Sequence, residues 1–507
     1  MDSRRLLAAV SFALTMVLLL LLIQSLSAWM TRMQLQQDAA HTLATLRNGQ
    51  PLWQWPLRQP GDLIASRAFG QATVARDGDQ LRVTSLDGSP YDLGLPLSQA
   101  VDIVHWPLLR LHAQSDANGI LGLIWQSEDQ ATCLKVDAAT LSKGANEVTL
   151  DLRQLHGQTT TGSACPPPGI ATLLRLHPHL PAGSSLRLNK AELLADIAPA
   201  LPDTSSAAAS LTLSSDLATA QSQIAQWSKQ ANPPAVPWIR LPADAHAETL
   251  LALRDQLRPH WPAALIVPAG ATLTAKARVA LPIWTSWALC SAYLLLLTWF
   301  ALRPSAAWPA RPWVDLALVL TGPLWLIGGL QWGLHLSIPG VIAFAAALLY
   351  AMQAELRLRP WSWQWLGHHW GDWLWPLALV PMAIGLWLLF GHDAVHPGLR
   401  HAMTYVGWAC LQQWLMLAVV SRRLEQLRWP RAAQVVVIAS LFALLHTPNG
   451  MLMQLCLLAE LWWAWCFLRS RCLLPIAMAH ASCALIVESG LTGDLLRSLE
   501  ISARFFL

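Results

Sequence analysis

The sequence predicts a multi-domain membrane protein: an all-α, polytopic bundle of about eight transmembrane helices, preceded by an N-terminal membrane anchor and an extracytoplasmic, jelly-roll-like β-sandwich. Three observations predict this fold class. Hydrophobic residues make up 54% of the 507 residues and charged residues only 13%, so the chain is more apolar than an ordinary soluble protein. Long uncharged stretches lie near the start of the chain and recur from residue 281 onward. Between them, short stretches alternate apolar and polar residues, as strands do.

The first 30 residues are predicted to form a transmembrane anchor. Residues 6–30 carry no charge and follow the basic sequence MDSRR, and this run is longer than the apolar core of a signal peptide, which is about 7–15 residues. The small-x-small sequence Ser25-Leu26-Ser27 keeps a cleaved signal peptide as the alternative. Because basic flanks stay in the cytoplasm, we expect a multi-pass protein of the bacterial inner (plasma) membrane with residues 31–280 in the periplasm.

Residues 31–200 are predicted to form the β-sandwich. Alternating stretches such as QLRVTSL, NEVTLDL and SLRLNKAEL are separated by turn sequences, including Asp77-Gly78 and Pro166-Pro167-Pro168, which is the pattern of an antiparallel sandwich. The order of these strands resembles the galactose-binding-type jelly roll of many carbohydrate-binding modules. A glycan or an envelope protein is therefore the expected partner of this domain.

Two short regions connect the sandwich to the membrane domain. Residues 201–235 are rich in Ala and Ser and are expected to be a linker with one helical stretch. Residues 236–280 contain WIRLP, the helix-like AETLLALRDQLRPHW and ALIVPAG, and predict a small strand-helix-strand unit.

Residues 281–507 are predicted to form the polytopic bundle. The apolar spans lie at approximately 281–302, 313–333, 337–354, 373–391, 400–420, 432–447, 450–468 and 472–491. Arg residues fall in alternate loops between these spans, at 303–311, 357–359, 422–431 and 469–471. Since basic loops stay on the cytoplasmic side, all four of these loops are expected there.

Composition and spacing argue against several classes of protein and site. The net charge of +4 with scattered Arg residues gives no nucleic-acid footprint. Cys133 and Cys165 lie in the polar half, where an oxidising compartment would allow them to pair, and the other six cysteines lie in or beside apolar segments without metal-ligand spacing. We therefore expect no metal and no cofactor. A transporter ranks low because inverted repeats are not visible.

Five polar side chains inside the apolar spans are the candidate site residues: Gln412, Gln413, His446, Glu460 and His480. Polar groups within a bilayer need a partner, a cavity or a function. Hydrogen bonds between helices are the structural alternative for each of them.

The arrangement of these residues resembles the CPBP group of intramembrane proteases, which includes the CAAX prenyl endopeptidases and the Abi-type bacteriocin-processing proteins. In that group one helix carries Glu-Glu-x-x-x-Arg, the next ends in Phe-x-x-x-His and a later one carries His-x-x-x-Asn. Here Phe442 and His446 in FALLHTPN match the second motif, and His480 in LLPIAMAHASCAL matches the start of the third. The resemblance covers about residues 370–490.

The resemblance implies that the first Glu and the histidine of the second motif activate water, while the third motif stabilises the oxyanion. This chain has Gln412 and Gln413 at the Glu-Glu positions, Leu417 at the Arg position and Ala484 at the Asn position. An amide can position a water molecule but is not a useful base at neutral pH. Any base must therefore be His446, His480 or the lone carboxylate Glu460.

Two functions follow as hypotheses. The first is an intramembrane endopeptidase that cuts a membrane-associated peptide or protein in contact with lipid. The second is a catalytically inactive relative that serves as a membrane scaffold or binding module, with a glycan- or protein-binding domain outside the membrane.

Overall fold

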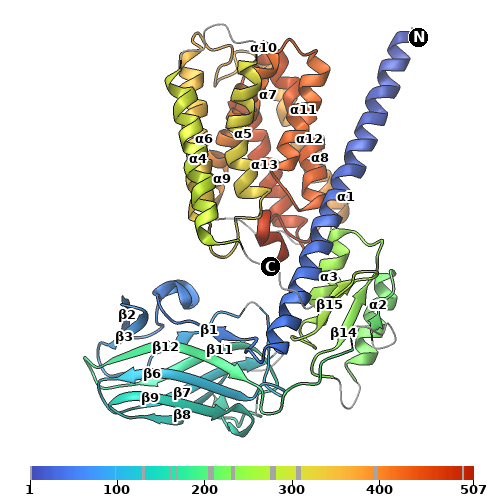
Figure 1. The fold of residues 1–507 in the computed structure, drawn as a ribbon. Coiled ribbons are helices and arrows are strands. Elements are labelled where there is room, and N and C mark those ends of the chain that lie inside the picture. Colours follow the sequence, from blue (N-terminus) through green and yellow to red (C-terminus); the bar gives the residue numbers. More distant parts are fainter. Residues whose placement is uncertain are drawn as a thin grey trace. The chain divides into compact units, whose positions relative to one another are not determined.

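The computed structural model describes residues 3–97, 99–127, 132–159, 161–166, 168–203, 210–229, 234–273, 281–303, 310–392, 398–493 and 496–507. The chain folds into two compact units. One contains the first 32 residues and the chain from about residue 279 onward, and the other contains most of residues 33–278. Helix α1 (Ser3–Arg47) begins in the first unit and continues into the second (Figure 1).

The second unit contains the predicted antiparallel sandwich. Its strands are β1 (Gln54–Trp55), β2 (Ala72–Asp77), β3 (Gln80–Ser85), β4 (Leu93–Gly94), β5 (Val101–Asp102), β6 (Leu108–Ser115), β7 (Gly119–Ser127), β8 (Cys133–Leu141), β9 (Gly144–Asp151), β10 (Gln158–Thr159), β11 (Ile170–His179) and β12 (Ser185–Leu194). One sheet has the order β2-β3-β12-β6-β9 with β1 beside β12, and the other has β10-β8-β7-β11-β4 with β5 beside β11. The fold class expected for this region is confirmed.

Alternation along the strands explains how the sandwich forms. In β6, Leu109, Leu111 and Ala113 are buried while the residues between them are partly exposed, because successive side chains of a strand point to opposite faces. Cys133 and Cys165 form a disulfide. It ties the start of β8 to the segment that follows β10.

A small parallel sheet, β13-β14-β15, follows the sandwich. It is formed by β13 (Leu211–Thr212), α2 (Leu217–Trp227), β14 (Trp238–Leu241), α3 (Ala247–Leu257) and β15 (Leu265–Pro268). The strand-helix-strand pattern read from residue 236 onward corresponds to β14, α3 and β15. The Ala/Ser-rich stretch before it contains β13 and α2. Since β13 pairs with β14 in parallel, this stretch is part of the small sheet.

The first unit is the helical bundle, drawn in yellow to red in Figure 1. Its helices are α4 (Ile283–Leu302), α5 (Arg311–Ile327), α6 (Ile338–Arg357), α7 (Trp370–Leu377), α8 (Leu379–Phe390), α9 (Leu399–Gln413), α10 (Ser421–Gln426), α11 (Arg431–Leu444), α12 (Gly450–Ser470) and α13 (Leu474–Gly490). Each predicted apolar span has a helical counterpart among them. Six helices of the described residues, α1 included, are long and apolar enough to cross a membrane. The chain is a multi-pass membrane protein.

One span departs from regular α-helix directly after the Gln pair. A π-helical segment, Trp414–Val420, joins α9 to α10, so the predicted span 400–420 continues to Gln426. Such π-helical turns occur frequently at functional sites.

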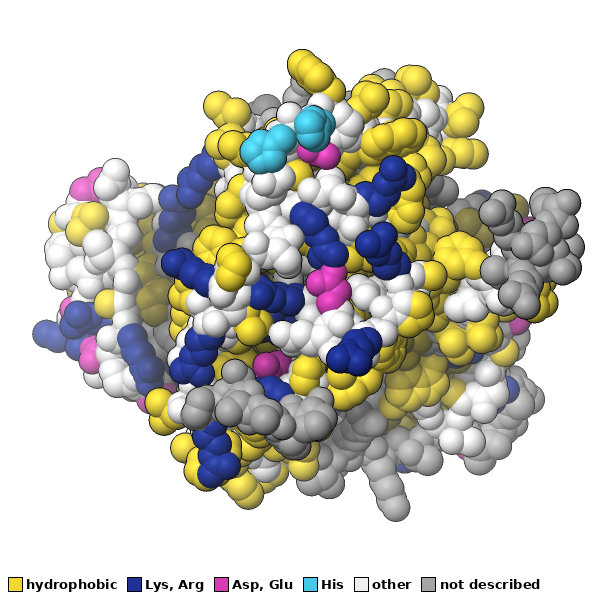
Figure 2. All heavy atoms as spheres, turned by 90° about the horizontal axis from the view of Figure 1, so that it is seen from above, with side chains coloured by type: hydrophobic (Ala, Val, Ile, Leu, Met, Phe, Trp, Pro, Cys, Tyr) yellow, Lys and Arg dark blue, Asp and Glu magenta, His cyan; other side chains and the backbone are white. Residues whose placement is uncertain are grey.

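The basic loops lie at one end of the bundle. Arg303 follows α4, Arg311 begins α5 and Arg431 begins α11. Figure 2 looks onto the molecule from above and shows the dark-blue Lys and Arg side chains gathered there.

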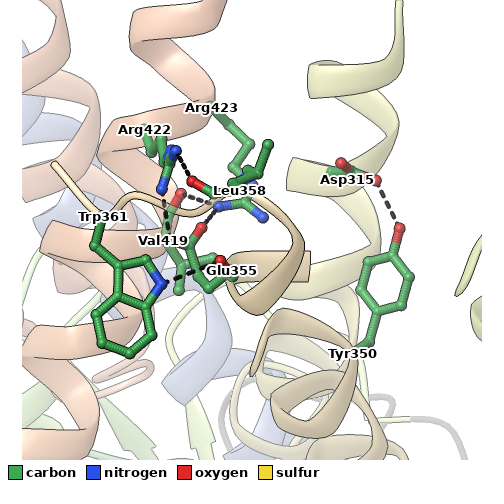
Figure 3. A network of polar contacts seen from close by, with 8 residues as sticks. All are labelled: Asp315, Tyr350, Glu355, Leu358, Trp361, Val419, Arg422 and Arg423. Atoms are coloured by element: carbon green, nitrogen blue, oxygen red, sulfur yellow. Dashed lines mark hydrogen bonds and ion pairs between the residues drawn. The ribbon is translucent and has the colours of Figure 1, made fainter. Parts of the chain in front are cut away.

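Beneath this basic end lies a buried ionic network that the sequence does not reveal (Figure 3). Glu355 of α6 is 2% exposed and Arg423 of α10 is 0% exposed, and the two form an ion pair. Arg422 joins Glu355 at 3.4 Å. Nearby, the Tyr350 hydroxyl donates to Asp315 at 2.6 Å. Asp315 is therefore held inside the bundle by specific partners, Tyr350 and Arg311.

Candidate active site

His446 stands in the turn between α11 and α12. The helix ends there because Pro448 has no N–H and the residue before a proline avoids helical geometry. Asn449 then caps α12, its side-chain oxygen accepting from the Leu452 N–H at 3.2 Å. The end of α11 and the cap of α12 therefore define the backbone before and after Thr447.

The hydrogen bond made by His446 defines which of its nitrogens carries the proton. Nδ1 of His446 lies 2.9 Å from the backbone carbonyl oxygen of Phe442. A carbonyl only accepts, so Nδ1 donates its hydrogen and a neutral ring keeps its lone pair on Nε2. His446 is 8% exposed.

His480, on α13, has the opposite arrangement. The Gln413 amide nitrogen lies 3.2 Å from Nδ1 of His480 and 3.0 Å from a carboxylate oxygen of Glu460. Because an amide N–H donates, Nδ1 of His480 accepts and a neutral ring carries its proton on Nε2. The two histidines therefore offer complementary groups, an acceptor on His446 and a donor on His480.

Aromatic rings hold both imidazoles in place. The ring of Phe442 lies edge-on between them, with centroid distances of 4.8 Å to His446 and 5.5 Å to His480. Trp463 of α12 lies against His480 at 5.3 Å. Phe442 is fully buried, so the pair is set into the packed interior rather than on a mobile surface.

Three of the five candidate residues, Gln412, His446 and His480, line one cavity of about 210 Å³. The other lining residues are Tyr405, Trp408, Phe442, Leu452, Leu455, Cys456, Ala459, Trp463, Cys483, Ala484, Val487, Leu499 and Ile501. The lining is mostly apolar with a few convergent polar groups, as in many ligand sites.

Gln413 and Glu460 do not line this cavity. Both are 0% exposed, and among the described residues Gln413 is the hydrogen-bond partner of Glu460. Gln413 is joined to the cavity residue His480 by its hydrogen bond to Nδ1. In the described part of the chain, no group of three or more His, Cys, Asp or Glu residues is placed to hold a metal ion.

Residues 395–486 match the family model Rce1-like, described as type II CAAX prenyl endopeptidase Rce1-like. This region, referred to below as the Rce1-like domain, is similar to that family. The match spans Gln412, His446 and His480, and it confirms the resemblance to the CPBP intramembrane proteases. No curated protein matches the chain significantly.

Two residues of the Rce1-like domain show what the departures from the family motifs change in the structure. Ala484 lines the cavity where the motif has Asn, so one polar group of the site is missing. Leu417 is fully buried in the apolar core of the bundle, where an Arg would need an anionic partner. The cavity therefore retains two histidines and an amide, without a carboxylate among its lining residues.

Solved structures of carbohydrate-binding modules are also similar to this chain. A family 29 module is 10% identical, with 25% of this chain and 76% of that chain covered and a TM-score of 0.18. The family 11 module of the cellulosomal cellulase Lic26A-Cel5E of Clostridium thermocellum is 12% identical, with 25% and 85% covered and a TM-score of 0.20. TM-scores of this size support no inference about a ligand.

Sequence reasoning missed two features of the site. The link from Glu460 through Gln413 to His480 joins three different helices, and no local pattern indicates it. Leu499 and Ile501 line the cavity from a segment that follows the last span, where the sequence contains no matching motif.

Proposed function

We propose that the Rce1-like domain is an intramembrane endopeptidase that hydrolyses a peptide bond of a membrane-associated substrate. The observation that carries the proposal is the pair His446 and His480 on one cavity, with Nε2 available on each ring and opposite hydrogen-bonding character. Hydrolysis of an amide needs a base for water and a donor for the oxyanion. The two rings supply one of each.

In the proposed reaction, water attacks the carbonyl carbon while Nε2 of His446 takes its proton. The carbonyl oxygen gains the electron pair of the broken π bond and accepts a hydrogen bond from Nε2–H of His480. His446 then returns the proton to the leaving nitrogen as the C–N bond breaks, which yields an acid and an amine. Gln412 holds the water through its amide, and Gln413 with Glu460 positions His480 from behind.

The absence of a carboxylate predicts slow catalysis, because nothing in the cavity lining neutralises the imidazolium that forms on His446. Placing a carboxylate at the lining position, Gln412→Glu, is expected to raise the cleavage rate about 10²-fold, within the range of one general acid-base group. Gln413→Glu places the same group next to Glu460, outside the cavity. It is expected to lower the rate.

The test uses the purified full chain in detergent with candidate membrane peptides, and products are identified by mass spectrometry. His446→Ala and His480→Ala should abolish cleavage. His401→Ala is the matched control, because His401 pairs with Glu488 at 2.9 Å and does not line the cavity. Cleavage that survives both cavity variants contradicts the proposal.

The second candidate function is a binding module that retains the protease fold without its reaction. Gln412 and Ala484 favour it, because they line the cavity where the family motifs have Glu and Asn. The test uses a peptide that binds the wild-type chain. If neither the wild-type chain nor the Gln412→Glu variant cuts this peptide, the binding module is the better proposal. The sandwich would then serve as the domain that recognises a glycan or an envelope protein outside the membrane.

A further inference from the structure

A segment far along the chain occupies one side of the candidate active site. Leu499 and Ile501 line the same cavity as His446 and His480. Glu500, between them, pairs instead with Arg504 at 2.9 Å. The backbone at Ile501 is extended, with φ −126° and ψ 171°. Alternate side chains of this segment therefore enter the cavity, which is the pattern of an extended strand.

The turn that carries His446 holds this segment by its main chain. The Ser502 N–H donates to the Thr447 carbonyl oxygen at 2.7 Å. The side-chain amide of Asn449 donates to the carbonyl oxygens of Ser498 at 2.7 Å and Glu500 at 3.2 Å. These contacts do not depend on which side chains the segment carries.

Main-chain hydrogen bonds combined with pockets for alternate side chains are how proteins bind extended peptides. We propose that the Thr447–Asn449 turn and the cavity form a docking track for an extended peptide with branched aliphatic side chains at alternate positions, and that residues 498–502 occupy this track in cis. The inference rests on the proposed function and names its substrate class. A substrate must displace residues 498–502 before its peptide bond reaches His446.

Asn449→Asp separates the two roles of Asn449. Aspartate keeps an oxygen that accepts from the Leu452 N–H, so the cap of α12 is retained. It loses the N–H donor and places an anion against two carbonyl oxygens. We expect amide hydrogen exchange over residues 498–502 of the full chain to become at least tenfold faster. Glu500→Gln is the matched control, because Glu500 does not line the cavity and its change should leave this exchange rate unaltered.

Peptide docking is measured with a fluorescent peptide of the sequence Arg-Ser-Leu-Glu-Ile-Ser-Ala, which copies residues 497–503. The double variant Leu499→Asp/Ile501→Asp should release the segment while leaving the Thr447–Asn449 turn intact, so fluorescence anisotropy should show at least tenfold tighter binding to this chain than to wild type. Asn449→Asp removes a donor of the track and should not bind the peptide more tightly than wild type does. A peptide with Asp in place of both aliphatic residues should not bind. Should Asn449→Asp unfold the chain, hydrogen exchange over residues 498–502 is compared between Leu499→Asp/Ile501→Asp and wild type instead.

The binding measurement needs no cleavage, so the two proposals fail separately. If residues 498–502 exchange faster and the peptide still does not bind, the docking track is overturned. Equal exchange in Asn449→Asp and wild type also overturns it. If the peptide binds but no peptide is ever cut, the docking track is supported and the endopeptidase proposal fails.

Discussion

Gln413 donates hydrogen bonds to Glu460 and to His480, which makes it the residue that links a buried carboxyl to the cavity. Gln413→Leu removes both bonds. We expect a loss of about 1–3 kcal/mol of stability, the cost of leaving a buried polar group without a partner. We also expect kcat to fall more than KM rises, since the tautomer of His480 is no longer fixed. Thermal unfolding in detergent and steady-state peptide cleavage measure the two effects.

Glu460→Gln is the matched change, because its amide oxygen still accepts from Gln413. Stability should stay within about 1 kcal/mol of wild type. If Gln413→Leu and Glu460→Gln destabilise the chain equally, the hydrogen bond between them is not what matters at this position.

The buried pair of Glu355 and Arg423 allows a second prediction at the scale of single residues (Figure 3). Glu355→Leu leaves a guanidinium uncompensated inside the bundle, at a cost of about 3–5 kcal/mol. The double variant Glu355→Leu/Arg423→Leu should lose less than Glu355→Leu alone, since the fully buried guanidinium of Arg423 is removed as well and only the partly exposed Arg422 has lost its carboxylate. A double-mutant cycle by thermal unfolding checks the sign. If the stability losses of the two single variants simply add in the double variant, the prediction is contradicted.

The sequence motifs indicate a set of candidate residues, but they do not indicate where each side chain points. The resemblance to the family motifs singles out Gln412, His446 and His480, and all three line one cavity. The sequence does not indicate which way the side chain of Glu460 points. Helix α12 carries apolar residues on opposite faces, Leu457 and Trp463 among the buried ones and Leu458 and Trp465 among the exposed ones, so periodicity gives no inward face from which to orient the carboxyl.

At the scale of elements, the disulfide between Cys133 and Cys165 is the feature of the sandwich that can be tested most directly. It closes a loop of 32 residues, and loop-closure entropy for that length gives about 3–4 kcal/mol of stabilisation. Cys133→Ser/Cys165→Ser should lower the unfolding temperature of the sandwich. Calorimetry of the full chain measures this temperature. Cys290→Ala removes a buried free cysteine of the bundle and should leave that transition unchanged. Equal transitions in the double serine variant and wild type would contradict the prediction.

Helices were predicted more completely than strand pairing. The apolar spans locate α4 to α13 because a bilayer requires long uncharged runs. The sheet order is different, since β12 inserts between β3 and β6, and its partners in β3 are more than a hundred positions away along the chain. The aromatic residues of the sheets also give no support to the prediction of a glycan partner. In the described sandwich, Trp53, Trp55, Tyr91, Trp106 and Trp125 are all buried, whereas a sugar-stacking platform needs an exposed ring.

At the scale of the whole molecule, the basic end of the bundle indicates which side of the membrane each region faces (Figure 2). Basic loops stay in the cytoplasm, so we infer that Arg303, Arg359 and Arg431 face inward. Helix α11 begins at Arg431 and ends just before His446, which puts the candidate active site near the outward end. From the same alternation of spans we predict that the sandwich lies outside the cytoplasm. A disulfide there fits an oxidising compartment.

Single cysteines test this topology. Lys143→Cys lies on the exposed surface of the sandwich and Arg359→Cys lies in an exposed basic loop. In spheroplasts treated with a membrane-impermeant maleimide, Lys143→Cys should be labelled at once and Arg359→Cys only after the membrane is permeabilised. The wild-type chain is the control for labelling of its own free cysteines, of which Cys410, Cys456 and Cys483 are partly exposed. If Arg359→Cys is labelled in intact spheroplasts and Lys143→Cys is not, the orientation is reversed. The cavity would then receive its peptides from the cytoplasm.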